Sequence, residues 1–394
     1  MRILVFNCGS SSLKFELIEL GASDADGRTV VRGMIDSIGP AAHLTVKRED
    51  SIVADRQAPL TSHAEAAAAA LDALGANLRL DAVAHRFVHG GASVVAPCIA
   101  DPKILAALEE ASRFAPLHNP PALATLRAMQ QRFPGLPMFV IADTAFHRHM
   151  PPQASTYAIP RELADRHGIR RYGFHGAGHA WMLERYAALT GKTPGTVNLI
   201  TLQLGAGCSA TAIRNGVSVD TSMGLTPLEG LMMATRSGDL DPAIVAYLER
   251  AEKMNAGQVD HLLNNESGLL GVGGRKDMRE LEQAAGADEQ AALAIEMFCY
   301  RVKKYIGAYV AVLGRVDAVI FGAGIGEHSA AIRQRICRDL ENLGIILDAA
   351  RNCASDSGER RISGDQSPIA IWVIPLNEEL YIARAAVRLL RAAS

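Results

Sequence analysis

The chain lacks paired cysteines, long apolar runs and an excess of charge, and each absence excludes a class of protein. Its six cysteines form no C-x-x-C pair, so neither a zinc knuckle nor a dithiol redox motif is predicted, and a reducing compartment is expected. No apolar run approaches the roughly 18 residues needed to span a bilayer. The start of the chain also lacks the basic and apolar regions of a signal peptide. We therefore expect neither secretion nor membrane insertion, and we predict a cytoplasmic protein.

Net charge and length further limit the possible binding partners and the number of domains. The chain has 42 acidic and 40 basic residues, a formal net charge of -2, so there is no electrostatic reason to expect a nucleic-acid or membrane partner. Its 394 residues, of which 49% are hydrophobic, are enough for two domains of the usual size of roughly 100–200 residues. The proline pair at 151–152 marks a domain crossover. We place the boundary there, between residues 1–149 and 150–377.

Patterns along the chain predict alternating strands and helices. Strand signals are followed by a helix that begins after Ser62, with Glu65 three residues on, and that stops at Gly75. The later alternation of apolar strands with amphipathic helices indicates an α/β protein. Strands are predicted within 2–20, 28–39, 42–50, 81–91, 137–147 and 197–216, helices within 62–75, 102–114, 120–135 and 377–394, and a strand, a glycine-rich turn and a helix within 316–344.

Two stretches share one layout, an apolar strand, a turn of small residues and a second strand. The first is "RILVFNCGSSSLKFELIEL" and the second is "VNLITLQLGAGCSATAIRNG". Backbone N–H groups, serine hydroxyls and one lysine are the donors that a phosphate needs. A Walker A loop, G-x-x-x-x-G-K-[ST], is absent from the sequence. The weak repeat predicts a nucleotide held by two hairpins, and the alternative for either turn is an ordinary polar hairpin.

Eight stretches together resemble the acetate kinase family, within the acetate and sugar kinase, chaperone and actin superfamily. They are "NCGSSSLKF", "HRFVHGG", "APLHNPP", "ADTAFHRHMP", "RRYGFHGAGH", "SVDTSMGLTPLEGLMMATRSGDLDPA", "FGAGIGEHS" and "NEELYIAR". The resemblance implies two ribonuclease-H-like α/β domains with a nucleotide cleft, and a C-terminal helix, 378–394, that packs back on the first domain. It also implies a homodimer.

The activity that the resemblance implies is reversible transfer of the ATP γ-phosphoryl group to acetate, giving acetyl phosphate and ADP. A small carboxylic acid resembles a Glu side chain, with a pKa near 4.3, so it is ionised at neutral pH and needs no general base. An anion must instead approach an anionic phosphoryl group, which calls for positive charge and in-line alignment. This chemistry predicts arginines, and a guanidinium can grip a carboxylate or phosphoryl group at two points.

The resemblance assigns roles residue by residue. The catalytic set is Arg86, Asp143, His175 and Arg236, with His89, His118 and His179 as weaker candidates. Asn7, Ser10, Ser12, Lys14, Gly205, Ala206 and Gly207 would hold the phosphates, and Asp277, Met278, Arg279, Gly324, Ile325 and Gly326 the nucleoside. The acyl group would lie among Val88, Leu117, Phe174 and Pro227, with Arg86 on its carboxylate. Mg²⁺, with Mn²⁺ as an alternative, would be held by Asn7 and Glu378 near Asp143.

The sequence departs from the family pattern at three places. Ala206 stands where the second hairpin usually has an asparagine, Met278 replaces a usual phenylalanine beside the adenine, and Ala177 and Gly178 replace a threonine and a serine near His175. These changes leave the nucleotide preference open. A propionate or butyrate kinase stays an alternative, since one methylene is worth only ~1–3 kcal/mol in an apolar pocket. A non-catalytic nucleotide-binding module is a further alternative.

Overall fold

The computed structural model describes residues 1–21, 27–49, 51–75, 78–354 and 358–393. Asp50 and Ser394, the last residues of two predicted elements, lie outside these ranges. The chain folds into two compact units, each described here by itself. The first unit comprises 1–148, 176–178 and 377–394, and the second comprises 149–175 and 179–376.

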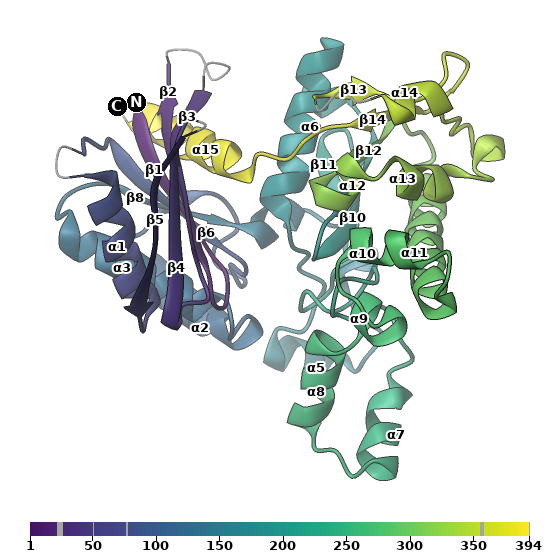
Figure 1. Cartoon of the computed structure of the whole chain (residues 1–394), viewed down its shortest axis with the longest axis horizontal. Coiled ribbons are helices and arrows are strands. Elements are labelled where there is room, and N and C mark those ends of the chain that lie inside the picture. The colour runs from purple at the N-terminus through teal and green to yellow at the C-terminus, as the bar shows by residue number, and fades with distance from the viewer. Residues whose placement is uncertain (22–26, 50, 76–77, 355–357, 394) are drawn as a thin grey trace. The chain divides into compact units, whose positions relative to one another are not determined.

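The first unit is built on an eight-stranded sheet in the order β5-β4-β3-β2-β1-β6-β8-β7 (Figure 1). Strands β1, β6 and β8 are parallel, and β2 to β5 continue the sheet as antiparallel neighbours. The strands are β1 (Arg2–Cys8), β2 (Leu13–Leu20), β3 (Gly27–Asp36), β4 (Gly39–Arg48), β5 (Ser51–Leu60), β6 (Ala82–Phe87), β7 (Cys98–Ile99) and β8 (Met138–Ala142). The helices are α1 (His63–Leu74), α2 (Pro102–Ala111), α3 (Asn119–Arg132) and α15 (Glu378–Ala393).

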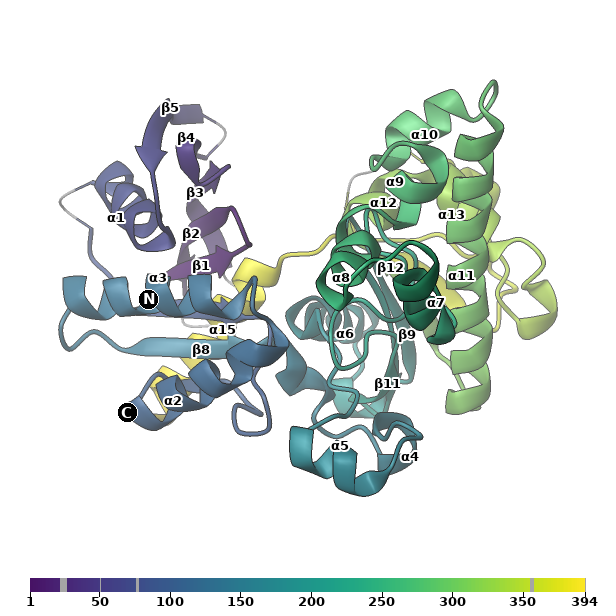
Figure 2. The same ribbon diagram turned by 90° about the horizontal axis from the view of Figure 1, so that it is seen from below.

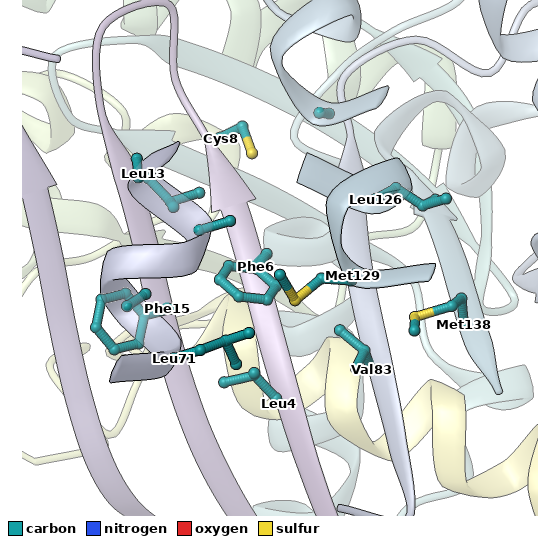
Figure 3. Close-up of a cluster of buried hydrophobic side chains, with 14 of the residues drawn as sticks. Leu4, Phe6, Cys8, Leu13, Phe15, Leu71, Val83, Leu126, Met129 and Met138 are labelled. Atoms are coloured by element: carbon teal, nitrogen blue, oxygen red, sulfur yellow. The ribbon is translucent and has the colours of Figure 1, made fainter. Parts of the chain in front are cut away.

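Both faces of the central strand β1 are covered, which explains its almost continuous apolar sequence. Helices α1 and α3 pack against one face, and α15 contacts β1, β6 and β8 on the other (Figure 2). Leu4, Phe6 and Cys8 point into the core below α1 and α3, together with Phe15 of β2 (Figure 3). The alternate residue Asn7 therefore lies on the α15 face.

The second unit has a six-stranded sheet in the order β11-β10-β9-β12-β14-β13. Helices α6 and α11 flank this sheet (Figures 1 and 2). The strands are β9 (Leu199–Leu204), β10 (Cys208–Arg214), β11 (Val217–Thr221), β12 (Ala318–Gly322), β13 (Arg360–Arg361) and β14 (Ala370–Val373). The helices are α4 (Pro152–Ser155), α5 (Arg161–His167), α6 (Gly176–Thr190), α7 (Ala243–Ala251), α8 (Ala256–Asn265), α9 (Gly268–Gly273), α10 (Met278–Ala284), α11 (Glu289–Leu313), α12 (Ala323–His328), α13 (Ala330–Cys337) and α14 (Ala349–Cys353).

The two sheets repeat one topology. In each, an antiparallel three-strand meander ends on a central strand, and two parallel strands continue the sheet on its other side: β3-β2-β1-β6-β8 in the first unit and β11-β10-β9-β12-β14 in the second. The weak sequence repeat therefore corresponds to a structural repeat, with β1 matching β9. Each unit carries a small-residue turn directly after its central strand. Within the ranges described, none of the helices combines the length and the apolar character needed to cross a membrane.

The strands and helices that the sequence patterns predicted are present, but many elements were not predicted, among them β5 and the long helix α11, and one predicted turn is wrong. Ser62 caps α1 by accepting from the Glu65 amide, and Gly75 follows the helix with φ 94°, as predicted. Strand β5 was missed because its sequence, SIVADRQAPL, is mostly exposed and shows no clean alternation. The glycine-rich turn predicted after β12 is wrong, because residues 323–328 form the short helix α12.

Helix α12 forms against the propensity of its glycines because Arg333 of α13 fixes its end. The Arg333 side chain is 1% exposed, and its Nη1 donates to the carbonyl oxygens of Gly326 and Glu327, both at 2.9 Å. Its Nε and Nη2 donate to the side chain and the carbonyl of Asn352 in α14, at 2.8 and 2.9 Å. Burial lowers the pKa of this guanidinium to about 10. One buried arginine thus joins three helices.

Replacing Arg333 by methionine removes these bonds and leaves buried carbonyl groups without donors. Each such group costs about 1–3 kcal/mol, so we expect Arg333→Met to lower the free energy of unfolding by about 3 kcal/mol or more. Arg335→Met is the matched control in the same helix, since the Arg335 side chain is 37% exposed and its ion pair with Glu296 spans 3.7 Å. Urea unfolding should show a change within about 0.5 kcal/mol for this control. Equal midpoints for the two variants would contradict the role given to Arg333.

Candidate active site

A buried ion pair joins two of the predicted residues in the first unit. Arg86, near the end of β6, donates from Nε and Nη2 to the two carboxylate oxygens of Asp143, at 3.0 and 2.6 Å. Asp143 follows β8, and its side chain is 1% exposed. Because β6 and β8 are parallel neighbours, the ends of both strands meet at one edge of the sheet. A carboxylate at this depth is stable only with such a partner.

The Arg86 guanidinium also binds the first hairpin. Its Nη1 donates to Oδ1 of Asn7 at 2.9 Å, and Asn7 pairs with Arg86 in the β1–β6 register. Burial by itself would lower the pKa of Arg86, but the Asp143 and Glu378 carboxylates outweigh it and raise the pKa above its usual value. A guanidinium has five N–H donors, and these contacts use three. One donor on each terminal nitrogen is not used by them.

Acidic side chains at the start of α15 complete this group. The Glu378 carboxylate lies 3.9 Å from Nε of Arg86, and Nδ2 of Asn7 donates to Oε1 of Glu379 at 3.1 Å. Burial and the neighbouring Glu378 and Glu16 carboxylates raise the pKa of Glu379. The resemblance assigned a role to Glu378 alone, and the contacts that hold the Asn7 amide between Glu379 and Arg86 were not predicted.

The first hairpin turn is organised by its backbone. The Gly9 amide donates to the Ser12 carbonyl at 2.9 Å, and Nε2 of His63 lies 3.0 Å from the Gly9 carbonyl oxygen. Lys14 pairs with Asn7 across β1 and β2. Ser10 and Lys14 are exposed and Ser12 is half-buried, so the predicted phosphate contacts of this turn lie at the surface of the unit.

The other two predicted catalytic residues belong to the second unit. His175 precedes α6 with φ 58°, a left-handed conformation that costs a residue with a side chain of order 1 kcal/mol or more. A Cβ at Gly207 would lie 3.4 Å from Nε2 and Cε1 of His175 and 3.8 Å from Nη1 of Arg236. The second hairpin, His175 and Arg236 therefore meet at one place. Because Gly207 has no side chain, the space beside His175 and Arg236 stays open.

Arg236 is a largely buried guanidinium whose contacts are with neutral groups. Its Nη1 donates to the Pro227 carbonyl oxygen at 3.2 Å and lies 3.7 Å from the Met233 sulfur. Among the described residues no carboxylate forms an ion pair with it. Burial lowers its pKa. A largely buried cation that no carboxylate of the described ranges neutralises is a candidate for binding an anionic ligand.

The stretch whose Pro227 carbonyl accepts from Arg236 is held by Arg171, a half-buried arginine. Nη1 of Arg171 donates to the carbonyl oxygens of Thr221 and Ser222, each at 3.0 Å, and its Nη2 donates to Glu229 at 2.6 Å. Glu229 also accepts from the Tyr157 hydroxyl. These contacts fix both ends of the stretch that contains Pro227. No role was predicted for Arg171 or Glu229, because no local motif marks either residue.

Seven of the predicted nucleotide-binding residues line one cavity of about 480 Å³ in the second unit. It is formed by the second hairpin and by the starts of α10 and α12. The predicted residues on its wall are Gly205, Ala206, Asp277, Met278, Arg279, Gly324 and Ile325, and Lys276, Glu282, His328 and Ser329 complete it. Gly326 is buried behind this wall, where a Cβ would meet Phe321 and Leu204. The size fits a small organic ligand.

The four residues predicted to bind the acyl group are divided between the units. Val88 and the 59% exposed Leu117 belong to the first unit, and the buried Phe174 and the half-buried Pro227 to the second. Of the weaker candidates, His89 is buried, with its Nδ1 accepting from the Gly91 amide at 2.9 Å. His118 precedes α3. His179 is fully buried and binds Thr201 and Ser209.

The donor set around Asn7 suits a hard cation that is held partly by its substrate. Asn7, Glu378 and Glu379 offer amide and carboxylate oxygens, the ligands that Mg²⁺ prefers. In the part of the chain that the structure describes, no group of three His, Cys, Asp or Glu side chains could hold a metal ion alone. Mg²⁺ usually keeps waters and binds through one or two carboxylates plus phosphate oxygens, so the residues present fit such a site.

The fold, with two repeated ribonuclease-H-like sheets, is of the actin-like ATPase class, as predicted. A sequence profile of the Acetokinase family matches residues 2–384. The chain belongs to this family.

Individual relatives agree over the whole length. The acetate kinase of Streptomyces coelicolor is 46% identical over 393 residues, covering 97% of this chain and 95% of the relative. The crystal structure of Porphyromonas gingivalis acetate kinase superposes with a TM-score of 0.93 at 37% identity, covering 99% of both chains. A propionate kinase from Francisella tularensis gives a TM-score of 0.91 at 39% identity, covering 98% of both.

Removing the Asp143 carboxylate should leave the Arg86 charge buried without its main partner. We expect Asp143→Ala to lower the free energy of unfolding by about 3–5 kcal/mol, and a second change, Arg86→Met, to recover much of this loss. The matched control is Glu110→Ala, because the Glu110 side chain is 73% exposed and lies 3.7 Å from Arg113. Urea unfolding of the four proteins measures the effect. A double variant less stable than Asp143→Ala would contradict the buried-charge explanation.

Proposed function

We propose that the protein is an acetate kinase that transfers the γ-phosphoryl group of ATP to acetate by direct in-line attack. A carboxylate oxygen of acetate forms a bond to the γ-phosphorus as the bond to the bridging oxygen of ADP breaks, and the electron pair leaves with ADP. No proton is transferred. The observation that supports this most strongly is the buried Arg86 cluster, in a chain 46% identical to a protein named acetate kinase.

The arginines supply what this reaction requires. Arg86, held in place by Asp143 and Asn7, would bind the acetate carboxylate through its two remaining N–H donors, which spread over both terminal nitrogens. Arg236 would face the transferring phosphoryl group, and His175 would donate a hydrogen bond to it. In this scheme Asp143 is a positioning residue, because both of its oxygens accept from Arg86.

The residues proposed to bind the metal, the phosphates and the nucleoside are assigned by the donor and acceptor atoms they offer. Asn7 and Glu378 would hold Mg²⁺, which when bound neutralises charge on the phosphate oxygens. Ser10, Ser12 and Lys14 would contact phosphate at the first hairpin, and Gly205, Ala206 and Gly207 at the second. The cavity that Met278 and Ile325 help to line would take the nucleoside.

The acyl group would be bound by Val88, Leu117, Phe174 and Pro227, whose apolar side chains suit a methyl group. Propionate is the competing substrate, since a propionate kinase is among the similar structures and one methylene changes binding by only ~1–3 kcal/mol. We further propose a cytoplasmic homodimer with domains 1–149 and 150–377 and helix 378–394 on the first. Sedimentation equilibrium would test the dimer.

The primary test is acyl phosphate formation with Mg²⁺ and ATP, assayed separately on acetate, propionate and butyrate. We expect acetate to give the highest kcat/KM. Arg236→Lys keeps the charge but loses the planar fork, so kcat/KM should fall roughly 100-fold or more. Arg250→Lys, in the last turn of α7, is the control and should keep wild-type kinetics. Hydroxamate trapping of the acyl phosphate measures the rates.

Three outcomes would count against the proposal or a part of it. No acyl phosphate from any of the three acids would overturn the kinase function and favour the non-catalytic module. A normal rate in Arg236→Lys would leave the reaction intact but remove the role given to Arg236. A higher kcat/KM for propionate would assign the alternative substrate within the same family.

Met278 offers a test of the nucleoside site. Its side chain is 4% exposed and lines the cavity. A phenylalanine there would supply a flat surface for the adenine, worth about 0.5–1.5 kcal/mol, so Met278→Phe should tighten ATP binding roughly 2- to 10-fold. Met278→Leu, which adds no ring, should bind ATP as the wild type does. Titration calorimetry with ATP measures both. Weaker binding in Met278→Phe together with unchanged binding in Met278→Leu would contradict stacking at this position.

A further inference from the structure

A row of buried hydroxyl groups faces α6 from the second sheet. Strands β9 and β10 pair with Ser209 opposite Gln203 and Thr211 opposite Thr201, so Thr201 and Ser209 project from the same face of the sheet. Their side chains are fully buried. The alternate residues of the two strands are apolar, and α11 packs against β9 and β10.

These hydroxyls form a continuous chain of hydrogen bonds with two histidines. Nδ1 of His179 lies 2.8 Å from Oγ1 of Thr201, and Nε2 of His179 lies 2.7 Å from Oγ of Ser209. The same Oγ lies 2.8 Å from Nδ1 of His175. His175 immediately precedes α6, and the His179 amide donates to the His175 carbonyl oxygen at 3.0 Å. His179 is fully buried.

The chain ends at the edge of His175 that faces the second hairpin. With Nδ1 bound to Ser209, the Nε2 and Cε1 atoms of the ring lie 3.4 Å from the position of a Cβ at Gly207. This is the place where Arg236 also approaches. The state of Nε2 therefore decides whether His175 offers a hydrogen-bond donor or a lone pair there.

The number of available protons limits the directions in which these hydrogen bonds can run. Ser209 has one hydroxyl proton, so it can donate to Nδ1 of His175 or to Nε2 of His179, but not to both. If it donates to His175, then His179 must donate from Nε2 and accept at Nδ1 from Thr201. Only this order, Thr201 to His179 to Ser209 to His175, leaves a neutral His175 with its proton on Nε2.

We propose that His179 and Ser209 are positioning residues that hold neutral His175 in the tautomer with the proton on Nε2. An anionic phosphoryl oxygen needs a donor, and a lone pair at Nε2 would repel it. The choice of this tautomer over the reverse order rests on the proposed function, whereas the hydrogen-bond chain itself is given by the distances between its members. The backbone of His175 is left-handed, and its ring lies between Ser209 of the sheet and Gly207 of the hairpin.

The tautomer can be measured directly in the free protein. Long-range ¹H–¹⁵N correlation spectra of protein labelled in histidine distinguish protonated from unprotonated ring nitrogens, and His175→Gln and His179→Gln identify the two signals. We expect both rings to carry the proton on Nε2. In Ser209→Ala and Thr201→Val, the His175 signal should move toward a mixture of tautomers, more in the first. A wild-type His175 with its proton on Nδ1 would overturn the proposal.

A matched pair of substitutions at His179 separates positioning from packing. Glutamine can present an amide N–H near the place of Nε2, whereas leucine fills the space without a donor. We expect His179→Leu to lower kcat for acyl phosphate formation roughly 10- to 100-fold with little change in KM for ATP, and His179→Gln to retain most of kcat. Equal losses in the two variants would show a packing role only and would overturn the proposal.

The two experiments fail separately. If the wild type makes no acyl phosphate, the proposed function is wrong, while the spectra still decide the tautomer. If the kinase is active and His179→Leu keeps its full kcat, the hydrogen-bond chain has no catalytic effect and the inference is wrong. Circular dichroism and thermal unfolding of each variant ensure that only folded protein is compared.

Discussion

The bidentate pair between Arg86 and Asp143 is the interaction on which the first unit depends. Neither charge could lie at this depth alone, because an unpaired buried ion costs several kcal/mol. The pair joins two parallel strands at their ends, and it sets the direction in which the guanidinium presents its remaining donors. Asn7 joins it to the first hairpin, and Glu379 joins that hairpin to α15. Charge compensation thus assembles four segments that are distant in sequence.

In the second unit, neutral groups position the predicted site residues, whereas the first unit uses an ion pair. Its central strand β9 leads into a hairpin turn of small residues at the topological position that the first hairpin holds after β1. Here the polar face of the sheet carries hydroxyls, which bind His179 and, through Ser209, His175. Arg236 is left with carbonyl and thioether contacts. A cation that the protein does not neutralise is suited to an anionic ligand.

Much of the fold could be predicted from local sequence. The remaining elements and site contacts depend on residues that are distant in the sequence. The Ser62 cap of α1 and the apolar strands could be predicted because cap chemistry and periodicity are local properties. The carboxylate after β8 could be recognised as needing a partner, but Arg86 lies 57 residues away in the sequence. The predictions failed at strand β5 and helix α12 because the stability of both elements comes from tertiary contacts, which in α12 are those of Arg333. Ser209 carried no signal, since one serine in an apolar strand looks like any other.

The departures from the family pattern take on a physical meaning beside the hydrogen-bond chain. At Ala177 and Gly178, where the resemblance predicts a threonine and a serine, α6 offers the ring no hydroxyl. Ser209 lies on the sheet instead, buried on all sides and bound to both imidazoles. A partner anchored in a paired strand has fewer conformations than one in the first turn of a helix, and less entropy is lost when it binds. The sheet, rather than the helix, therefore determines how His175 faces the second hairpin.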